Sequence, residues 1–202
     1  MVDQKDVLVL GAEAGAVLAY FAGTAGTSLW RSWLLFKNST DFGVKDVQFN
    51  LDISFFAFRL PFWQSLISWG FSALILAILA AGAVHYLYGG LRPQMRQDRS
   101  TPFARAQLSV LLGLVVLLKG VAYWFDRFAL SLKENKLITG LTYSDVNALL
   151  PAKAILAGIA VICSLLFFAN IFRKSWFLPA SGTALLVISA VLIAGVYPAA
   201  IQ

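Results

Sequence analysis

Five long apolar runs, separated by short charged connections, most constrain how this chain can fold. Each run reaches or approaches the roughly 20 residues that an α-helix needs to cross the hydrocarbon core of a bilayer. Runs of this kind must be helical, because lipid offers no hydrogen-bond partners to backbone N–H and C=O groups. The runs cover residues 7–29, 62–88, 108–125, 154–172 and 177–197. The sequence therefore predicts an all-α, polytopic transmembrane helix bundle that forms a single domain over residues 1–202.

The composition also favours a membrane. The chain is 59% hydrophobic and only 13% charged, whereas about a quarter of the residues in a soluble domain are charged. Its net charge of +6 comes from Lys and Arg in short clusters between the apolar runs, a pattern typical of membrane orientation and not of nucleic-acid binding. We expect contact with the lipid bilayer, with other membrane subunits or further copies of the chain as candidate partners, and no nucleic acid.

Two longer connections, residues 30–61 and 130–150, are predicted to lie at the membrane surface. The first interleaves aromatic and charged residues, which suits a segment between acyl chains and water. In the second, Ser144 and Asp145 predict the cap of a short helix that ends at Pro151. The first apolar run could instead be a signal peptide, but its start carries Asp3 and Asp6 against Lys5, and signal peptides begin with net positive charge.

The charge distribution predicts how the chain is oriented. Five spans place the two termini on opposite sides of the membrane. The side that holds the N-terminus concentrates its basic residues in two short connections, Arg92–Arg105 and Arg173–Lys174, and charges in short connections near helix ends weigh most in the positive-inside rule. We therefore predict a multi-pass protein of the cell (inner) membrane, with a cytoplasmic N-terminus and an extracytoplasmic C-terminus.

The first apolar run contains small residues at every fourth position. This spacing predicts a shallow helix face that another helix can approach closely. The residues of this face are Gly11, Gly15, Ala19 and Gly23.

Ionisable residues within predicted spans are the candidate functional residues, because charge is costly in hydrocarbon. They are Glu13 and Lys119, with Asp126 at the end of the same run as Lys119. One hypothesis is an aqueous pathway lined by these side chains. The other is that Lys119 extends toward Asp126, two turns away on the same helix face, and so reaches the outer interface.

No catalytic, metal-binding or cofactor-binding set of residues can be assembled from the sequence. His85 is the only histidine, which makes a poor metal site, and it is interpreted as an interfacial residue. Cys163 is the only cysteine and lies within an apolar run, so it is interpreted as a small core residue. We expect no cofactor and no enzymatic activity.

Several segments of the chain resemble the UPF0182 family of bacterial membrane proteins. They are FGVKDVQFNLDISFFAFRLPF, HYLYGGLR, AQLSVLLGLVVLLKGVAYWFDRF, TGLTYSDVNALLPAK and FFANIFRKSW followed by LPA. One departure is Val47, where the family pattern has proline. The resemblance implies a much longer protein, with seven membrane helices before a large extracytoplasmic domain, of which this chain matches the last five helices. The chain would then be a fragment or a truncated reading frame.

The resemblance implies no known activity, because the family is uncharacterised. The expected role is a membrane anchor and scaffold for the extracytoplasmic domain. The alternative is a component of a transporter or channel, in which the polar residues of the spans contact a water-filled path.

Overall fold

The computed structural model describes residues 20, 23, 24, 26, 29–92, 100–133, 140–171 and 177–191. The chain forms two compact units, Met1–Trp69 and Gly70–Gln202, whose boundary lies within helix α2. The described part contains helices and connections but no strand, with isolated β-bridges at Lys45–Asp52 and Leu91–Ser100. The predicted all-α class is confirmed.

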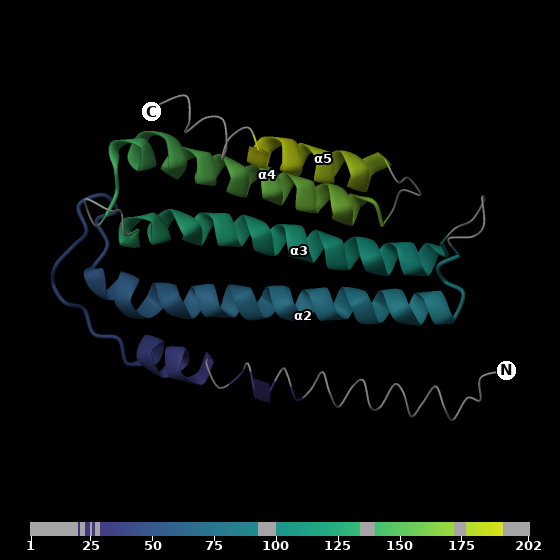
Figure 1. The fold of residues 1–202 in the computed structure, drawn as a ribbon, viewed down its shortest axis with the longest axis horizontal. Helices are drawn as coiled ribbons and strands as arrows, with labels where there is room; N and C mark the ends of the chain where they lie inside the picture. The colour runs from purple at the N-terminus through teal and green to yellow at the C-terminus, as the bar shows by residue number, and fades with distance from the viewer. Residues whose placement is uncertain are drawn as a thin grey trace. The chain divides into compact units, whose positions relative to one another are not determined.

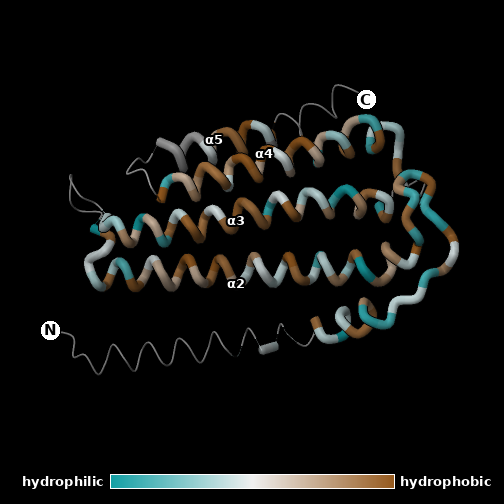
Figure 2. Tube along the Cα trace, turned by 180° about the vertical axis from the view of Figure 1, so that it is seen from behind, coloured by the Kyte–Doolittle hydropathy of each residue, from teal (hydrophilic) through white to brown (hydrophobic). Residues whose placement is uncertain are grey.

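Three described helices are long and apolar enough to cross a membrane (Figures 1 and 2). The first, Phe55–Leu87, consists of the π turn η1 (Phe55–Arg59) followed by α2 (Leu60–Leu87). The second, Pro102–Leu132, consists of α3 (Pro102–Ala129) followed by the 3-10 turn η2 (Leu130–Leu132). The third, Asp145–Ala169, consists of the π turn η3 (Asp145–Leu149) followed by α4 (Leu150–Ala169). A further helix, α5, covers Phe177–Val191. Most of the first predicted span and the end of the fifth lie outside the described residues.

These helices begin before the apolar runs that predicted them. Helix α3 starts at Pro102, six residues before residue 108, because Thr101 caps it: the Thr101 hydroxyl accepts the N–H of Ala104 at 3.3 Å. Proline, which lacks a backbone N–H, costs no hydrogen bond at the first helical position, because an N–H there would have no partner within the helix. The hydropathy pattern marks the stretch that suits hydrocarbon, whereas capping residues set where the helix begins.

The prediction of a short helix that ends at Pro151 is wrong. One helix runs from Asp145 through Pro151 to Ala169, and a π turn, η3, precedes the proline. In it the N–H of Leu150 donates to the carbonyl of Asp145, five residues back. Proline cannot donate an N–H and its ring crowds the preceding turn of an α-helix, so the wider π turn accommodates it. The ends of both predicted surface segments are therefore first turns of membrane-length helices.

The same arrangement opens the helix that contains α2. The π turn η1 precedes Pro61, and the N–H of Leu60 donates to the carbonyl of Phe55. Both π turns are followed directly by a Leu-Pro pair, so the two helices begin with the same local backbone structure.

Within the second unit, α3 packs against α4, and α4 packs against α5 (Figure 1). Small residues allow the close approach of α3 and α4. A Cβ on Gly120 would lie 3.2 Å from the Cβ of Ala160 and 3.3 Å from the carbonyl oxygen of Ala157. A Cβ on Gly113 would lie 2.7 Å from the ring of Phe168. This interface was not predicted, although two glycines seven residues apart on one helix face are the signal for it.

The small-residue face predicted on the first run cannot be followed along its length. Gly11, Gly15 and Ala19 lie outside the described residues. At Gly23 an added Cβ would meet no described atom within 4 Å. The predicted packing face therefore stays a prediction.

Candidate functional site

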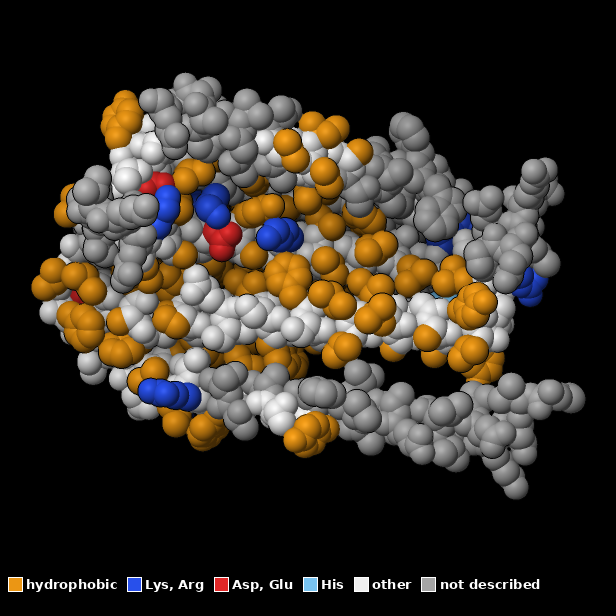
Figure 3. Space-filling view, in the orientation of Figure 1, with side chains coloured by type: hydrophobic (Ala, Val, Ile, Leu, Met, Phe, Trp, Pro, Cys, Tyr) orange, Lys and Arg blue, Asp and Glu red, His pale blue; other side chains and the backbone are white. Residues whose placement is uncertain are grey.

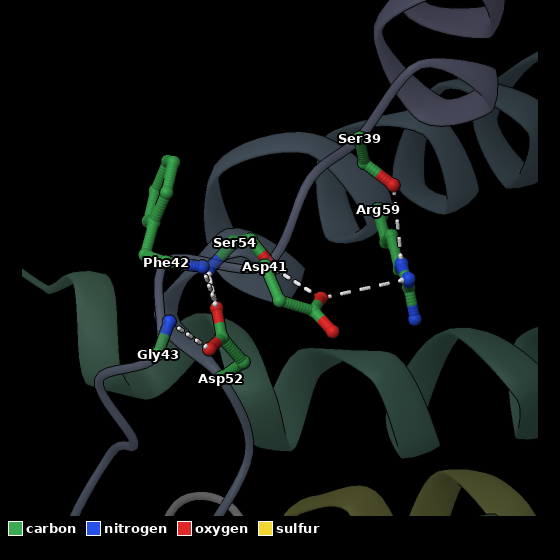
Figure 4. Close-up of polar contacts among 7 residues, drawn as sticks. All are labelled: Ser39, Asp41, Phe42, Gly43, Asp52, Ser54 and Arg59. Atoms are coloured by element: carbon green, nitrogen blue, oxygen red, sulfur yellow. Dashed lines mark hydrogen bonds and ion pairs between the residues drawn. The ribbon is translucent and has the colours of Figure 1, made fainter.

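The connection between residues 38 and 54 is built around the carboxylate of Asp52 (Figure 4). Its two oxygens accept backbone N–H groups from Phe42 at 3.0 Å, Gly43 at 2.8 Å and Ser54 at 2.8 Å. These donors, Phe42 first, favour the charged carboxylate and lower the pKa of Asp52 to about 2. Asp52 therefore holds together backbone segments about ten residues apart.

A second aspartate shapes the tip of this connection. Asp46 accepts the N–H groups of Gln48 at 3.0 Å and Phe49 at 2.8 Å. Asn50 adopts a positive φ of 53°, a conformation that asparagine tolerates better than most residues. Val47 at the tip is fully exposed, and it needs no proline to complete the turn, so the departure from the family pattern is compatible with this fold.

The third aspartate of the connection also has partners. Asp41 accepts the hydroxyl of Ser54 at 3.2 Å and lies 3.8 Å from the guanidinium of Arg59. The Nε–H of Arg59 donates to the hydroxyl of Ser39 at 3.4 Å (Figure 4). All three aspartates serve contacts within the connection, which marks it as a preorganised structural element.

A line of charged side chains, called the charge ladder below, lies at one end of the second unit. Figure 3 shows blue and red side chains gathered at one end of this face, among apolar ones. Lys133 Nζ lies 3.2 Å from Asp145 Oδ1, and Lys153 Nζ lies 3.0 Å from Asp126 Oδ2. Lys119 Nζ lies 4.7 Å from the centre of the Tyr123 ring, as a cation–π contact. The ladder's residues are Lys119, Asp126, Lys133, Asp145 and Lys153.

Asp145 is the most buried member of the ladder, with 1% of its side chain exposed. It accepts the Thr142 N–H at 2.9 Å and the Thr142 hydroxyl at 2.6 Å, in addition to the ammonium of Lys133. A buried carboxylate is tolerated only when it is paired and hydrogen-bonded in this way. Asp145 thus joins the end of the α3 helix to the start of the α4 helix.

Lys119 and Asp126 have different partners among the described residues. Asp126 pairs with Lys153 of α4, because α4 begins beside the end of α3 and Lys153 reaches across. Lys119 turns toward Tyr123, four residues further along its own helix, which is the spacing at which helical side chains meet. Glu13 lies outside the described residues. Lys153 was not singled out from the sequence, because its role depends on how two helices align.

Two polar pairs join α3 and α4 at a spacing close to the thickness of a bilayer core. The Asn170 amide donates to the Ser109 hydroxyl at 3.0 Å, and Lys153 meets Asp126 at the other end. Ser109 and Asp126 are 17 residues apart, about 26 Å along a helix, which is close to the thickness of the hydrocarbon core. Lys119 lies about 10 Å inside the Asp126 end of this stretch.

Within the described part of the chain, neither His85 nor Cys163 belongs to a metal-binding group. His85 Nε2 lies 2.9 Å from Gln107 Oε1, and Cys163 is fully buried. Among the described residues there is no group of three His, Cys, Asp or Glu side chains that could hold a metal ion.

The described residues, with their helices and the braced connection, contain the segments at residues 42–62, 85–92 and 106–128, in which the chain resembles UPF0182. The family described as "Uncharacterised protein family (UPF0182)" matches residues 2–202. The chain belongs to this family. It is similar to UPF0182 protein SCO5204 of Streptomyces coelicolor, with 49% identity over 98% of this chain and 20% of that relative. It is also similar to UPF0182 proteins of Nocardioides sp. and Thermobifida fusca, 47% and 46% identical over 92% of this chain and 18% of each relative.

This UPF0182 chain thus spans about a fifth of the length of the curated relatives it matches. No solved structure matches it significantly. The family and these relatives carry no name of an enzyme, so their names assign no reaction to the chain.

Proposed function

We propose that this chain is a membrane anchor and scaffold, and that in the longer UPF0182 proteins it holds an extracytoplasmic domain at the cell membrane. The observation that carries the proposal is the packed contact between α3 and α4. Gly120 of α3 lies against Ala157 and Ala160 of α4 with no room for a Cβ at ordinary distance, and Cys163 is fully buried. A contact this close supports a tightly packed bundle more than a water-filled path.

The outward surface of the membrane-length helices supports the same role. Large apolar side chains remain exposed along them, including Leu79 at 63%, Ile162 at 56% and Leu165 at 60%. Such side chains are stable when they face acyl chains. The density of basic residues in the Arg92–Arg105 connection favours a cytoplasmic location for this end and for the N-terminus, and an extracytoplasmic C-terminus.

A second candidate function is a component of a transporter or channel. The charge ladder favours it, because Lys119 lies about 10 Å inside the apolar stretch and ionisable residues at such depth mark pathways in many membrane proteins. The anchor is the better supported of the two, since Asp126 and Asp145 already have cationic partners within the bundle.

Water access along α3 distinguishes these two functions. Cys163→Ala removes the only native thiol, and single cysteines then replace Val115, Lys119 or Leu132. The variants are labelled in intact membranes with a polar, membrane-impermeant maleimide. The anchor predicts labelling at the half-exposed Leu132 and none at Val115 or Lys119. Labelling at Val115, the position furthest from the Asp126 end, would overturn the anchor in favour of an aqueous path.

The orientation has its own test. Alkaline phosphatase, which is active only outside the bacterial cytoplasm, is fused after Gln202. We expect a membrane-bound and active fusion. An inactive fusion would exclude an anchor for an extracytoplasmic domain, whatever the labelling along α3 shows.

A further inference from the structure

Lys119 is the one lysine of the charge ladder that lacks a carboxylate partner among the described residues. Lys133 pairs with Asp145, and Lys153 pairs with Asp126, each across two different helical segments. The ammonium of Lys119 lies 4.7 Å from the centre of the Tyr123 ring. The ladder thus contains three cations and two anions, so among the described residues one positive charge within an apolar stretch has no carboxylate partner.

The depth of Lys119 makes this charge costly. Its Cα lies about 10 Å inside the Asp126 end of α3, and a lysine stem that extends toward Tyr123 recovers about 6 Å of that. A charge in hydrocarbon is retained at a few kcal/mol of cost, and such residues pair with one another when a partner is within reach. A carboxylate at the level of Lys119 would complete the pattern that the other two lysines already follow.

The residues around Lys119 form a surface suited to a neighbouring helix. Leu112 is 40% exposed, and the other members of the surface are also partly exposed. They recur at intervals of three and four residues, the spacing by which one helix packs along another. The surface, called the Lys119 seam below, consists of Leu112, Val115, Lys119, Ala122 and Asp126.

We propose that the Lys119 seam binds a transmembrane helix of another protein, and that this helix carries an Asp or Glu at the depth of Lys119. Charge complementarity selects this partner. An anionic lipid headgroup would approach from the membrane surface and meet the carboxylate of Asp126 first, which is 40% exposed and repels it. A second copy of the chain would offer Glu13, but that residue is six positions from the other end of its run, about 9 Å inside the opposite side.

This inference rests on the membrane location in the proposed function and goes beyond it by naming the class of partner. A model helix tests it: a Leu-rich transmembrane peptide with one Glu placed about 10 Å from its outer end, and a matched peptide with Leu at that position. The peptides carry an acceptor dye, and the protein carries a donor dye on a C-terminal tag. Association is measured by energy transfer in vesicles of zwitterionic lipid.

We expect the Glu peptide to bind the wild-type chain at least about fivefold more tightly than the Leu peptide, as interhelical polar contacts in membranes allow. Lys119→Leu should abolish the difference, and Lys119→Arg should keep it. Lys45→Leu serves as the matched lysine control and should keep it as well, because Lys45 lies outside the seam, in the connection between residues 38 and 54.

Three results would overturn the proposal. The first is equal binding of the two peptides by the wild-type chain. The second is a difference that survives Lys119→Leu. The third is a difference that disappears when anionic lipid is added to the vesicles, which would assign Lys119 to headgroups. Recovery of all variants in the membrane fraction, together with active phosphatase fusions, separates these results from a failure of the proposed membrane location.

Discussion

Replacement of single glycines by alanine should show whether the α3–α4 contact holds the bundle together. At Gly120 the new Cβ would lie 3.2 Å from the Cβ of Ala160 and 3.3 Å from the carbonyl oxygen of Ala157. One of these atoms belongs to the backbone of α4, so the helices must separate by a few tenths of an ångström. Gly158 is the matched control, because it lies within α4 and an added Cβ there meets no described atom within 4 Å.

The magnitude follows from the difference between these two variants. Both gain the same helix propensity, about 1 kcal/mol when Gly becomes Ala within a helix. Only Gly120→Ala adds a methyl group to a filled contact, which typically costs 1–3 kcal/mol. We therefore expect Gly120→Ala to be about 1–3 kcal/mol less stable than Gly158→Ala, which corresponds to a difference in Tm of roughly 2–12 °C for a chain of this length.

The native cysteine supplies the assay. Cys163 is the only cysteine of the chain and is fully buried, so a dye that fluoresces on reaction with thiols reports unfolding of the protein in detergent. The midpoint for Gly158→Ala should equal or exceed that of the wild-type chain, and the midpoint for Gly120→Ala should be lower. Identical midpoints for the two variants would refute the argument that close packing at Gly120 stabilises the bundle.

Three further predictions concern polar contacts. The pKa of Asp52 is lowered from 3.8 to about 2, so its stabilisation of the connection is complete above pH 4 and is lost as the pH falls toward 2. The protection factor of the Gly43 amide against hydrogen exchange, which is the intrinsic rate at each pH divided by the observed rate, should fall over that range, and a constant protection factor would count against the bracing role. Asp126→Ala and Lys153→Ala should be non-additive, with a coupling of about 0.5–3 kcal/mol in the Cys163 assay, whereas additive losses would mean that the pair contributes nothing. Thr101→Ala should cost about 1 kcal/mol and Thr101→Ser much less, and equal losses would exclude capping by the hydroxyl.

The class of fold could be predicted from the sequence because hydropathy acts over whole segments. Three apolar runs, predicted at residues 62–88, 108–125 and 154–172, overlap the membrane-length helices Phe55–Leu87, Pro102–Leu132 and Asp145–Ala169. Helix starts depend on local chemistry that hydropathy does not report. The cap at Thr101 and the π turn before Pro151 move two starts toward the N-terminus by several residues.

The candidate site was harder to predict than the fold, because it depends on how helices align. Lys119 and Asp126 were identified as costly charges from their positions within one run. The partner of Asp126 is Lys153, 27 residues away on another helix, and nothing in the spacing of one helix indicates that pair. The network of Asp52 was missed for a similar reason, since it joins backbone N–H groups and not a recognisable motif.

The two π turns before Pro61 and Pro151 have a consequence for the phase of the helices that they open. A π turn holds one more residue than an α-helical turn, so side chains before it are rotated by about 100° relative to an unbroken helix. Deletion of one residue within Phe55–Arg59 or Asp145–Leu149 would restore α-helical phase and swing the preceding segment around the span, while the apolar stretch itself stayed unchanged. Each π turn thus sets the direction in which the segment before it, with Asp52 or Thr142, extends from the helix. This direction can change without changing which apolar side chains of the helix face lipid.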